Sequence, residues 1–365
     1  MEGWRTRLWL IGLLSLLVAA CSGAATTTTG STGTTGTETT EATETTQATS
    51  SEPPAAVRLG YFPNVTHAPA LVGVADGLFQ AELGDVPLET FTFNAGTEAV
   101  EALFAGAIDM SFIGPNPAIN AYAQSEGAAI RIIAGSTSGG AALVVKPEVN
   151  GPEDLAGLKI ATPSLGNTQD VALRAWLQEQ GFETTPEGGG DVSVIPQANG
   201  QSLATFLSGE IDGAWVPEPW ATRLVLEGGG KVLVDERDLW PGGEFVTTHL
   251  IVSTEFLENY PDAVAAVLRG LVASIDQIND DPTSSQATVN ASIEGLTGSA
   301  MSDETIAGAW ANLTFTLDPI ADSLRASADH AVSVGLLEPV DLGGIYSLDA
   351  LNAILSFMNR ETITS

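Results

Sequence analysis

The sequence contains few of the residues that supply most metal and redox chemistry. Among its 365 residues there is one cysteine, Cys21, and the three histidines, His67, His249 and His330, lie far apart. A single cysteine cannot form a disulfide within the chain, so the folded part depends on its hydrophobic core. With that cysteine near the N-terminus, a His/Cys metal site is not expected, and no cofactor is implied.

Sequence motifs of the common enzyme classes are also missing. The chain has no Gly-x-Ser-x-Gly elbow, no His-Glu-x-x-His, no phosphate-binding Gly-Lys-Ser/Thr loop and no dinucleotide-binding Gly-x-Gly-x-x-Gly. We therefore expect a protein that is not an enzyme. An enzyme that uses His67 and Glu218 as acid and base stays open as an alternative.

Basic residues are scarce relative to acidic ones. The chain has 13 Lys and Arg against 45 Asp and Glu, and its net charge is −32. A surface of that sign repels the phosphates of nucleic acids and of anionic lipids. Neither nucleic acid nor an anionic lipid surface is therefore expected as a partner.

The first 21 residues have the composition of an export signal. Arg5 and Arg7 precede an apolar run over residues 8–20, which is shorter than the ~20 residues that a membrane-spanning helix needs. The small residues just before Cys21 resemble a bacterial lipobox. That resemblance implies that Cys21 is the lipid-modified first residue of an extracytoplasmic protein, anchored at the outer face of the cell membrane or in the periplasm. A secreted protein with a spare thiol is the alternative.

Residues 22–55 consist almost entirely of Thr, Ser, Gly, Ala and Glu and end in two prolines. Such a segment cannot bury enough apolar surface to offset the entropy of ordering it, so we expect a disordered tether. The rest of the chain, about 310 residues, is long enough for two lobes of ordinary size.

One unit of sequence occurs twice. Residues 96–117 and 199–219 each predict an amphipathic helix, a Gly-x-Ile-Asp segment, a buried strand and a Pro-x-Pro turn. The turns place Asn116 and Glu218 at equivalent corners, where a strand ends and the next helix begins. Ligands bind at this edge of open α/β sheets, and two lobes with facing corners would enclose a cleft. A doubly wound sheet in which Asn116 only caps a helix is the alternative.

The predicted strands and helices give an α/β fold with two lobes, each a mixed, mostly parallel sheet flanked by helices. Residues 56–145 and 250–365 are assigned to lobe 1, and residues 146–249 to lobe 2. The strand that starts at residue 250 is expected to return the chain to lobe 1. The helical segments after Pro261 are expected to pack there.

Polar clusters stand where predicted strands pass into helices or loops. They occupy residues 62–67, 164–170 and 247–249, and a Ser/Thr/Gly loop is predicted over residues 135–140. At the start of a helix the first backbone N–H groups point at whatever lies above the sheet. These clusters are therefore the candidate ligand contacts.

Several motifs, in the right order, resemble one known family. They are Gly60-Tyr61-Phe62-Pro63-Asn64, residues 99–109 ending in Ala-Gly-Ala-Ile-Asp, Gly166-Asn167-Thr168-Gln169-Asp170 with Leu173-Arg174, and Gly209-Glu210-Ile211-Asp212 with Trp215 and Glu218-Pro219. The family is the substrate-binding proteins of ABC importers for aliphatic sulfonates, taurine and nitrate. The similarity covers residues 57–340.

The resemblance implies a periplasmic-binding-protein-like fold, in which two lobes joined by crossing strands close on one ligand. It also implies a monomeric receptor that hands a small organic anion, above all an aliphatic sulfonate, to a membrane permease with a cytoplasmic ATPase. Nitrate, taurine, bicarbonate and pyrimidine precursors of thiamine remain alternatives. The Cys-rich motif of a related fungal pyrimidine synthase is missing, which disfavours an enzyme.

A sulfonate in this cleft would be held without cationic side chains, because Arg and Lys do not occur in the suspected loops. Helix N-terminal amides and neutral side chains would bind its oxygens, and Trp215 and Phe62 would cover its alkyl part unless they pack in the core. The Glu218 carboxylate would repel it unless protonated, turned away or paired with an amine on the ligand. The candidate ligand-binding residues are Phe62, Asn64, Thr66, His67, Gly96, Thr97, Asn116, Ser138, Gly139, Asn167, Thr168, Gln169, Trp215, Glu218 and Thr248.

Overall fold

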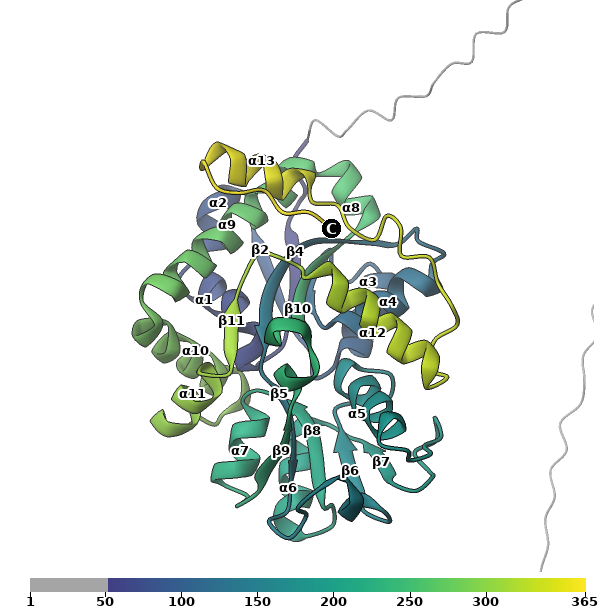
Figure 1. Ribbon diagram of the computed structural model, residues 1–365. Coiled ribbons are helices and arrows are strands. Elements are labelled where there is room, and N and C mark those ends of the chain that lie inside the picture. The colour runs from purple at the N-terminus through teal and green to yellow at the C-terminus, as the bar shows by residue number, and fades with distance from the viewer. Residues whose placement is uncertain (1–51) are drawn as a thin grey trace, which may run out of the picture. The chain divides into compact units, whose positions relative to one another are not determined.

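The computed structural model describes residues 52–365 (Figure 1). The predicted export signal, Cys21 and the predicted tether up to residue 51 lie outside the described residues. Within residues 52–365, no helix combines the length and the apolar character that crossing a membrane requires.

The strands form two mixed sheets. The six-stranded sheet has the order β11-β4-β10-β3-β1-β2, and the five-stranded sheet has the order β7-β6-β8-β5-β9. The strands are β1 Val57–Tyr61, β2 Leu88–Thr92, β3 Met110–Ile113, β4 Ile130–Gly139, β5 Ala141–Val145, β6 Lys159–Thr162, β7 Ser193–Pro196, β8 Gly213–Pro217, β9 Lys231–Asp235, β10 Val246–Ser253 and β11 Leu313–Phe315.

Helices pack on both sheets, and each sheet with its helices forms a lobe. In Figure 1 strands β5 to β9 with α5, α6 and α7 make the lower lobe, here lobe 2, and the six-stranded sheet belongs to lobe 1. The helices are α1 Ala68–Ala75, α2 Leu78–Leu83, α3 Gly96–Phe104, α4 Pro115–Gln124, α5 Thr168–Glu179, α6 Asn199–Ser208, α7 Trp220–Leu226, α8 Thr254–Asn259, α9 Pro261–Asp280, α10 Pro282–Thr297, α11 Asp303–Trp310, α12 Ala321–Ser333 and α13 Asp349–Phe357, with short 3-10 helices η1 Val65–His67, η2 Pro152–Leu155, η3 Glu236–Leu239 and η4 Pro241–Gly243.

The two lobes share one strand topology. In lobe 1, β1 lies between its parallel neighbours β2 and β3, and in lobe 2, β6 lies between β7 and β8 in the same way. The next strand is antiparallel in both and connects directly to the other lobe: β10 beside β3, and β5 beside β8. The prediction of two α/β lobes with mixed sheets is confirmed, and the duplicated unit corresponds to α3-β3-α4 and α6-β8-α7.

The Gly-x-Ile-Asp segments have the same structure in both lobes. Asp109 Oδ2 accepts a hydrogen bond from Arg58 N at 2.8 Å, and Asp212 Oδ2 accepts one from Lys159 N at 2.9 Å. Arg58 lies in β1, and Lys159 begins β6, the matching strand of the other lobe. Each aspartate therefore fixes the start of its own strand against the neighbouring parallel strand of its sheet, which explains why the motif occurs twice.

The chain crosses between the lobes at two adjacent segments. One crossing joins β4 to β5 through Gly139 and Gly140, whose φ angles of 78° and 74° suit residues without a side chain. The other enters β10 at Val246. Gly139 N donates to Phe245 O at 3.2 Å, so the two crossings are hydrogen-bonded to each other and form one hinge region.

Both expected lobe boundaries shift in the structure. Residues 141–145 were assigned to lobe 1, but they form β5, which pairs with β8 and β9 in lobe 2. The return strand begins at Val246 instead of residue 250. Residues 135–139, expected in a loop, continue β4, because they pair with β10 on one side and in part with β11 on the other.

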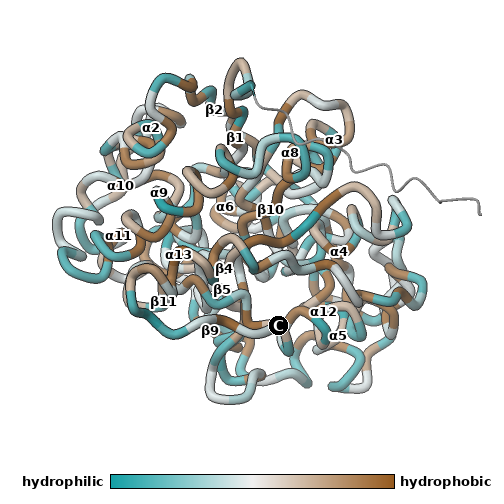
Figure 2. The backbone as a smooth tube through the Cα atoms, turned by 90° about the horizontal axis from the view of Figure 1, so that it is seen from above, coloured by the Kyte–Doolittle hydropathy of each residue, from teal (hydrophilic) through white to brown (hydrophobic). Residues whose placement is uncertain are grey.

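Helix α9 belongs to the larger of the two apolar clusters of lobe 1. It contacts α1 and α2, and its buried residues join those of β1, β4 and β10 in one apolar cluster. Figure 2 shows the apolar stretches along β10 and α9 within this lobe. Of the C-terminal helices, α13 packs on α9 in lobe 1, whereas α12 contacts both α4 of lobe 1 and α5 of lobe 2.

Candidate functional site

A small cavity lies between the two lobes. Its volume is about 30 Å³, which is room for about two water molecules. It is lined by Phe62, Asn64, Thr66, His67, Asn94, Gly114, Pro163, Asn167, Thr168, Gln169, Asn199, Pro217 and Thr247. Asp, Glu, Lys and Arg do not occur among these residues, although the chain as a whole carries a net charge of −32.

The lining residues gather where helices begin. Asn64 precedes η1, and Asn94 stands two residues before α3. Gly114 and Asn167 are the N-cap residues of α4 and α5, and Asn199 is the first residue of α6. The first turn of a helix has backbone N–H groups without partners inside the helix and carries a partial positive charge. Helix starts from both lobes therefore surround the cavity.

Two buried side-chain atoms at the cavity have no hydrogen-bond partner within residues 52–365. They are Thr168 Oγ1 and Asn199 Oδ1. A buried polar atom without a partner costs free energy, so such atoms are rare in native structures. Thr168 also lies close to lobe 1: a methyl group added at Gly114 would stand 2.6 Å from Thr168 Oγ1. The absence of a side chain at Gly114 is what lets the two lobes meet here.

His67 is a neutral group in this cavity. Its ring lies 4.5 Å from that of Phe62, centroid to centroid, and its Nδ1 accepts the Phe62 N–H at 3.4 Å. Burial lowers the pKa of His67 from 6.5 to about 3. Because Nδ1 is the acceptor, the proton of the neutral ring is on Nε2, which makes His67 an uncharged donor.

Polar contacts join the lobes around the cavity. Trp220 Nε1 donates to Asn64 Oδ1 at 2.9 Å, and Asn120 Nδ2 donates to Gly166 O at 3.5 Å. Asn64 and Asn120 belong to lobe 1, whereas Trp220 and Gly166 belong to lobe 2. The lobes are therefore in contact at the cleft, in a closed arrangement.

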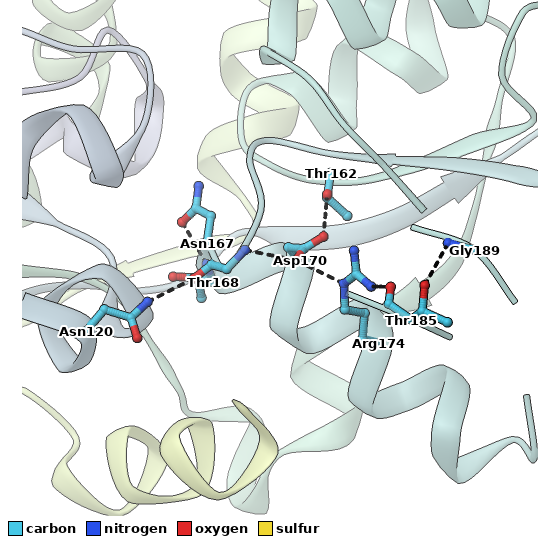
Figure 3. A network of polar contacts seen from close by, with 9 residues as sticks. Asn120, Thr162, Asn167, Thr168, Asp170, Arg174, Thr185 and Gly189 are labelled. Carbon is cyan, nitrogen blue, oxygen red and sulfur yellow. Dashed lines mark hydrogen bonds and ion pairs between the residues drawn. The ribbon is translucent and has the colours of Figure 1, made fainter. Parts of the chain in front are cut away.

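The start of α5 is fixed by a network behind the cavity (Figure 3). Asn167 Oδ1 accepts the Thr168 N–H at 2.6 Å. Asp170 accepts from Thr162 Oγ1 at 2.8 Å and from Gly166 N at 2.9 Å, which ties the end of β6 and the following loop to the helix. The loop that presents Thr168 and its neighbours is thus held by side chains of its own lobe.

Seven of the residues proposed from sequence line the cavity, and they come from two of the predicted clusters. They are Phe62, Asn64, Thr66, His67, Asn167, Thr168 and Gln169. Both clusters follow a strand and open a helix, and this is the signal that identified them.

Trp215 does not face the cleft. Its side chain is fully buried in lobe 2, where the indole N–H donates to Glu236 Oε2 at 2.7 Å and the ring packs 5.9 Å from that of Trp176. The alternative of core packing is therefore correct for Trp215. Phe62, for which both roles were open, does line the cavity.

The two corner residues, Asn116 and Glu218, do not face each other across the cavity. Asn116 is the second residue of α4, and its amide donates to Ser327 O of α12 at 3.1 Å. Glu218 accepts hydrogen bonds from Thr222 N at 3.0 Å and from Asn312 Nδ2 of lobe 1 at 2.7 Å. Burial raises the pKa of Glu218. At these corners the cavity is lined instead by Gly114, which precedes Asn116 in the chain, and by Pro217, which precedes Glu218.

The remaining candidates also lie outside the cavity lining. Thr248 Oγ1 donates to Thr66 O at 3.1 Å, and Ser138 Oγ accepts the Phe245 N–H at 3.3 Å. Both hydroxyls fix backbone near the hinge region. The other three candidates have different positions: Gly139 is part of a crossing, Gly96 is packed against Pro117, and Thr97 is exposed.

Six lining residues were missed from sequence: Asn94, Gly114, Pro163, Asn199, Pro217 and Thr247. Asn94 and Asn199 had a usable signal, because each precedes a glycine at the start of a copy of the repeated unit. Thr247 belongs to the predicted polar cluster over residues 247–249, but the candidate ligand contact in that cluster is its neighbour Thr248. In a strand, adjacent side chains point to opposite faces, so a choice wrong by one residue selects the wrong face.

Among residues 52–365, no group of His, Cys, Asp and Glu side chains has the arrangement of a metal site. The cavity itself offers amides, hydroxyls, a neutral imidazole and helix N-termini. These are hydrogen-bonding groups suited to a small polar molecule or a monoanion.

The chain is similar in sequence and in structure to several known binding proteins. The chain is 30% identical over 205 residues to the taurine-binding periplasmic protein of Escherichia coli, a match that covers 56% of this chain and 61% of that protein. The chain thus aligns with less than two thirds of that relative. Among solved structures, the alkanesulfonate-binding protein of Xanthomonas axonopodis pv. citri bound to MOPS matches with a TM-score of 0.68 at 20% identity, over 81% of this chain and 99% of that one.

The periplasmic nitrate-binding protein of Synechocystis matches with the same TM-score, 0.68, at 15% identity, over 83% of this chain and 89% of that one. At these identities the structural matches show the fold, which is that of periplasmic binding proteins. A family model described as NMT1-like matches residues 50–292, well over half of the chain. This two-lobed α/β protein therefore belongs to the NMT1-like family.

Proposed function

We propose that this protein is an extracytoplasmic receptor that binds a small organic anion between its lobes and delivers it to the permease of an ABC importer. The ligand class that we propose is an aliphatic sulfonate. The observation that carries the proposal is the cavity lining, which joins helix starts of both lobes and contains neutral donors but no charged side chain. The named relatives, which bind taurine, alkanesulfonates or nitrate, support it.

The lining suits a permanent monoanion. A sulfonate keeps its charge throughout the physiological pH range and presents three oxygen acceptors. Each helix N-terminus contributes the equivalent of roughly half a positive charge, and each hydrogen bond to an ionised group is worth roughly 1.5–3 kcal/mol. Thr168 Oγ1, one of the two partnerless buried atoms, is a hydroxyl that can donate to such an oxygen.

The apolar part of a short ligand has a surface to contact. Phe62, Pro163 and Pro217 line the same cavity, and burial of each CH₂ group contributes about 0.8 kcal/mol. The small volume, about 30 Å³, means that the lobes must move apart to admit a ligand and that a short one is favoured. This volume also favours nitrate as a second candidate ligand.

Closure would couple binding to delivery. A ligand that contacts both lobes shifts the population toward the closed form, with the double-glycine crossing at residues 139–140 as the hinge. A permease that distinguishes closed from open receptors would then receive loaded ones. In this proposal no chemical step occurs, and the protein acts as a monomer without enzyme activity.

The N-terminal part of the chain fits this role. Cys21 would carry the lipid, and the Thr-rich tether would let the domain reach the permease from the outer face of the membrane. Mass spectrometry of the processed N-terminus tests the anchor: a diacylglyceryl modification on Cys21 is expected, and an unmodified thiol would contradict it.

The binding proposal is tested by isothermal titration calorimetry with ethanesulfonate and nitrate, using the purified protein. We expect 1:1 binding of at least one of them. Thr168→Val, which replaces the hydroxyl by a methyl of the same shape, should weaken binding by about tenfold, the equivalent of ~1.4 kcal/mol. Since that hydroxyl has no hydrogen-bond partner within residues 52–365, the melting temperature should not fall. A lowered melting temperature with unchanged affinity would mean that the Thr168 hydroxyl is structural.

A further inference from the structure

A fully buried ion pair stands directly behind the cleft loop of lobe 2. Arg174 Nε donates to Asp170 Oδ2 at 3.0 Å, one helical turn apart in α5 (Figure 3). The side chains are 1% and 0% exposed. Arg174 also donates through Nη1 to Thr185 O, in the segment before β7, whereas its Nη2 has no partner within residues 52–365.

A contribution to the free energy of folding does not by itself explain why this ion pair is buried. Removing two charges from water costs several kcal/mol per ion, and apolar residues of similar size often stabilise a core at least as well. The chain has only 13 basic residues, and the other seven ion pairs found within residues 52–365 are partly exposed. One of the few cationic side chains is therefore buried, where removing its charge from water costs the most free energy.

The position of Asp170 explains what the arginine compensates. Asp170 follows Thr168 and Gln169, which line the cavity, and its carboxylate accepts the Gly166 N–H of the same loop. An uncompensated negative charge in this first turn would cancel the positive end of α5 and repel an anion in the cavity. The same carboxylate is needed to hold the loop, through Gly166 and Thr162.

We propose that Arg174 is a specificity-determining positioning residue: it neutralises Asp170, so that the loop keeps its carboxylate anchor while the cavity still accepts a monoanion. Arg174 does not touch the ligand. The positive charge of Arg174 decides whether the cleft can accept a negatively charged ligand. This inference rests on the proposed function, since it concerns the same site and an anionic ligand.

Removing the charge of either partner tests the proposal. The readout is the affinity for ethanesulfonate relative to that for ethanesulfonamide, its neutral analogue of the same shape, because a loosened loop weakens both ligands alike. Arg174→Gln leaves Asp170 without its ion pair and should lower this ratio by about tenfold or more, whereas Asp170→Asn leaves Arg174 without its ion pair and should raise it by at least about threefold. The double variant should return the ratio to near the wild-type value.

A merely structural pair gives a different pattern. Both single variants would then weaken ethanesulfonate and ethanesulfonamide together, without rescue in the double variant, and that pattern overturns the proposal. If Arg174→Gln fails to fold, Asp170→Asn alone decides: a higher ratio of ethanesulfonate to ethanesulfonamide affinity supports the proposal, and an equal or lower ratio overturns it. Arg325→Gln, at an exposed ion pair with Asp322, changes the net charge equally and should leave affinity unchanged.

The outcome is separable from that of the proposed function. If the wild-type protein binds neither ethanesulfonate nor nitrate, the receptor proposal fails. If it binds ethanesulfonate and Asp170→Asn does not raise the ratio of ethanesulfonate to ethanesulfonamide affinity, only the role of Arg174 is wrong.

Discussion

Trp220 of lobe 2 donates its indole N–H to Asn64 Oδ1 of lobe 1, at 2.9 Å, beside the cavity. The bond links α7 to the segment before η1, 156 residues away in the chain. It exists only while the lobes are closed, because its two partners belong to different lobes. Because the donor of this bond is a tryptophan, its fluorescence emission can report whether the lobes are closed.

Trp220→Phe should favour the open form. Loss of one net hydrogen bond, about 1 kcal/mol, predicts roughly fivefold weaker ligand binding. Small-angle scattering should show a larger radius of gyration than that of the wild type at the same ligand concentration. In the wild type, ligand should also change tryptophan emission, and this signal should be smaller in Trp220→Phe.

Trp310→Phe is the matched control. Trp310 packs 4.8 Å from Phe315, ring to ring, against the apolar cluster of lobe 1, so its replacement changes ring packing and leaves the bond between Trp220 and Asn64 in place. Its affinity for ligand should stay that of the wild type. Equal losses of affinity in both variants would contradict a role of Trp220 in closure.

Glu218→Gln concerns ligands that carry an amine. Taurine and ethanesulfonate differ by one amino group, and a carboxylate at the cavity would favour taurine. Glu218 instead bonds to Thr222 and Asn312 and does not line the cavity. We expect the ratio of the two dissociation constants to be the same in Glu218→Gln and wild type. A selective loss of taurine binding in calorimetry would show that Glu218 reaches the ligand.

Glu236 should make the protein less stable as pH rises. Burial raises its pKa from 4.5 to about 7, although the Trp215 N–H opposes this shift. The folded-state pKa lies above the unfolded one, so the stabilisation is complete below pH 4.5 and is lost as pH rises through 7. Glu236→Gln keeps an acceptor for Trp215 and removes the cost of ionisation.

Urea denaturation at several pH values measures this effect. The difference between pKa values of 4.5 and about 7 corresponds to a gain for Glu236→Gln of up to about 3 kcal/mol at pH 8. Near pH 4 the variant and the wild type should have similar unfolding free energies. A difference that does not change with pH would mean that the substitution acts through packing.

Local patterns were enough to predict the architecture. The Gly-x-Ile-Asp segments predicted helix ends and strand starts, and the structure shows why, since Asp109 and Asp212 each bond to the neighbouring strand within their own lobe. The helix start at Asn167 was predictable for a different reason: its cap bond joins it to the adjacent residue, Thr168.

Side-chain directions were not predictable where both faces of an element are buried. All five residues of β8 are buried, so hydrophobicity does not tell which face Trp215 occupies. Its partner Glu236 is 21 residues further along the chain. Glu218 likewise depends on Asn312, 94 residues away. Such choices are made by tertiary contacts that leave no periodic signal in the sequence.

Gly114→Ala should prevent closure without destabilising the lobes. The backbone of Gly114 has φ −72° and ψ 162°, which alanine adopts without strain. The added methyl, however, would stand 2.6 Å from Thr168 Oγ1 of the other lobe. Because this clash exists only in the closed form, we expect a wild-type melting temperature without ligand, an expanded radius of gyration with ligand, and binding weakened by at least tenfold.

Gly295→Ala is the control for this variant. Gly295 lies in α10 of lobe 1, and apart from its chain neighbours and the adjoining helix backbone no atom of residues 52–365 stands within 4 Å of an added methyl. Alanine in the helix should raise stability by roughly 0.5–1 kcal/mol and leave ligand binding unchanged. If Gly114→Ala binds ethanesulfonate as tightly as Gly295→Ala does, the ligand is held without the approach of Gly114 to Thr168. The binding site must then lie away from the contact between α4 and α5.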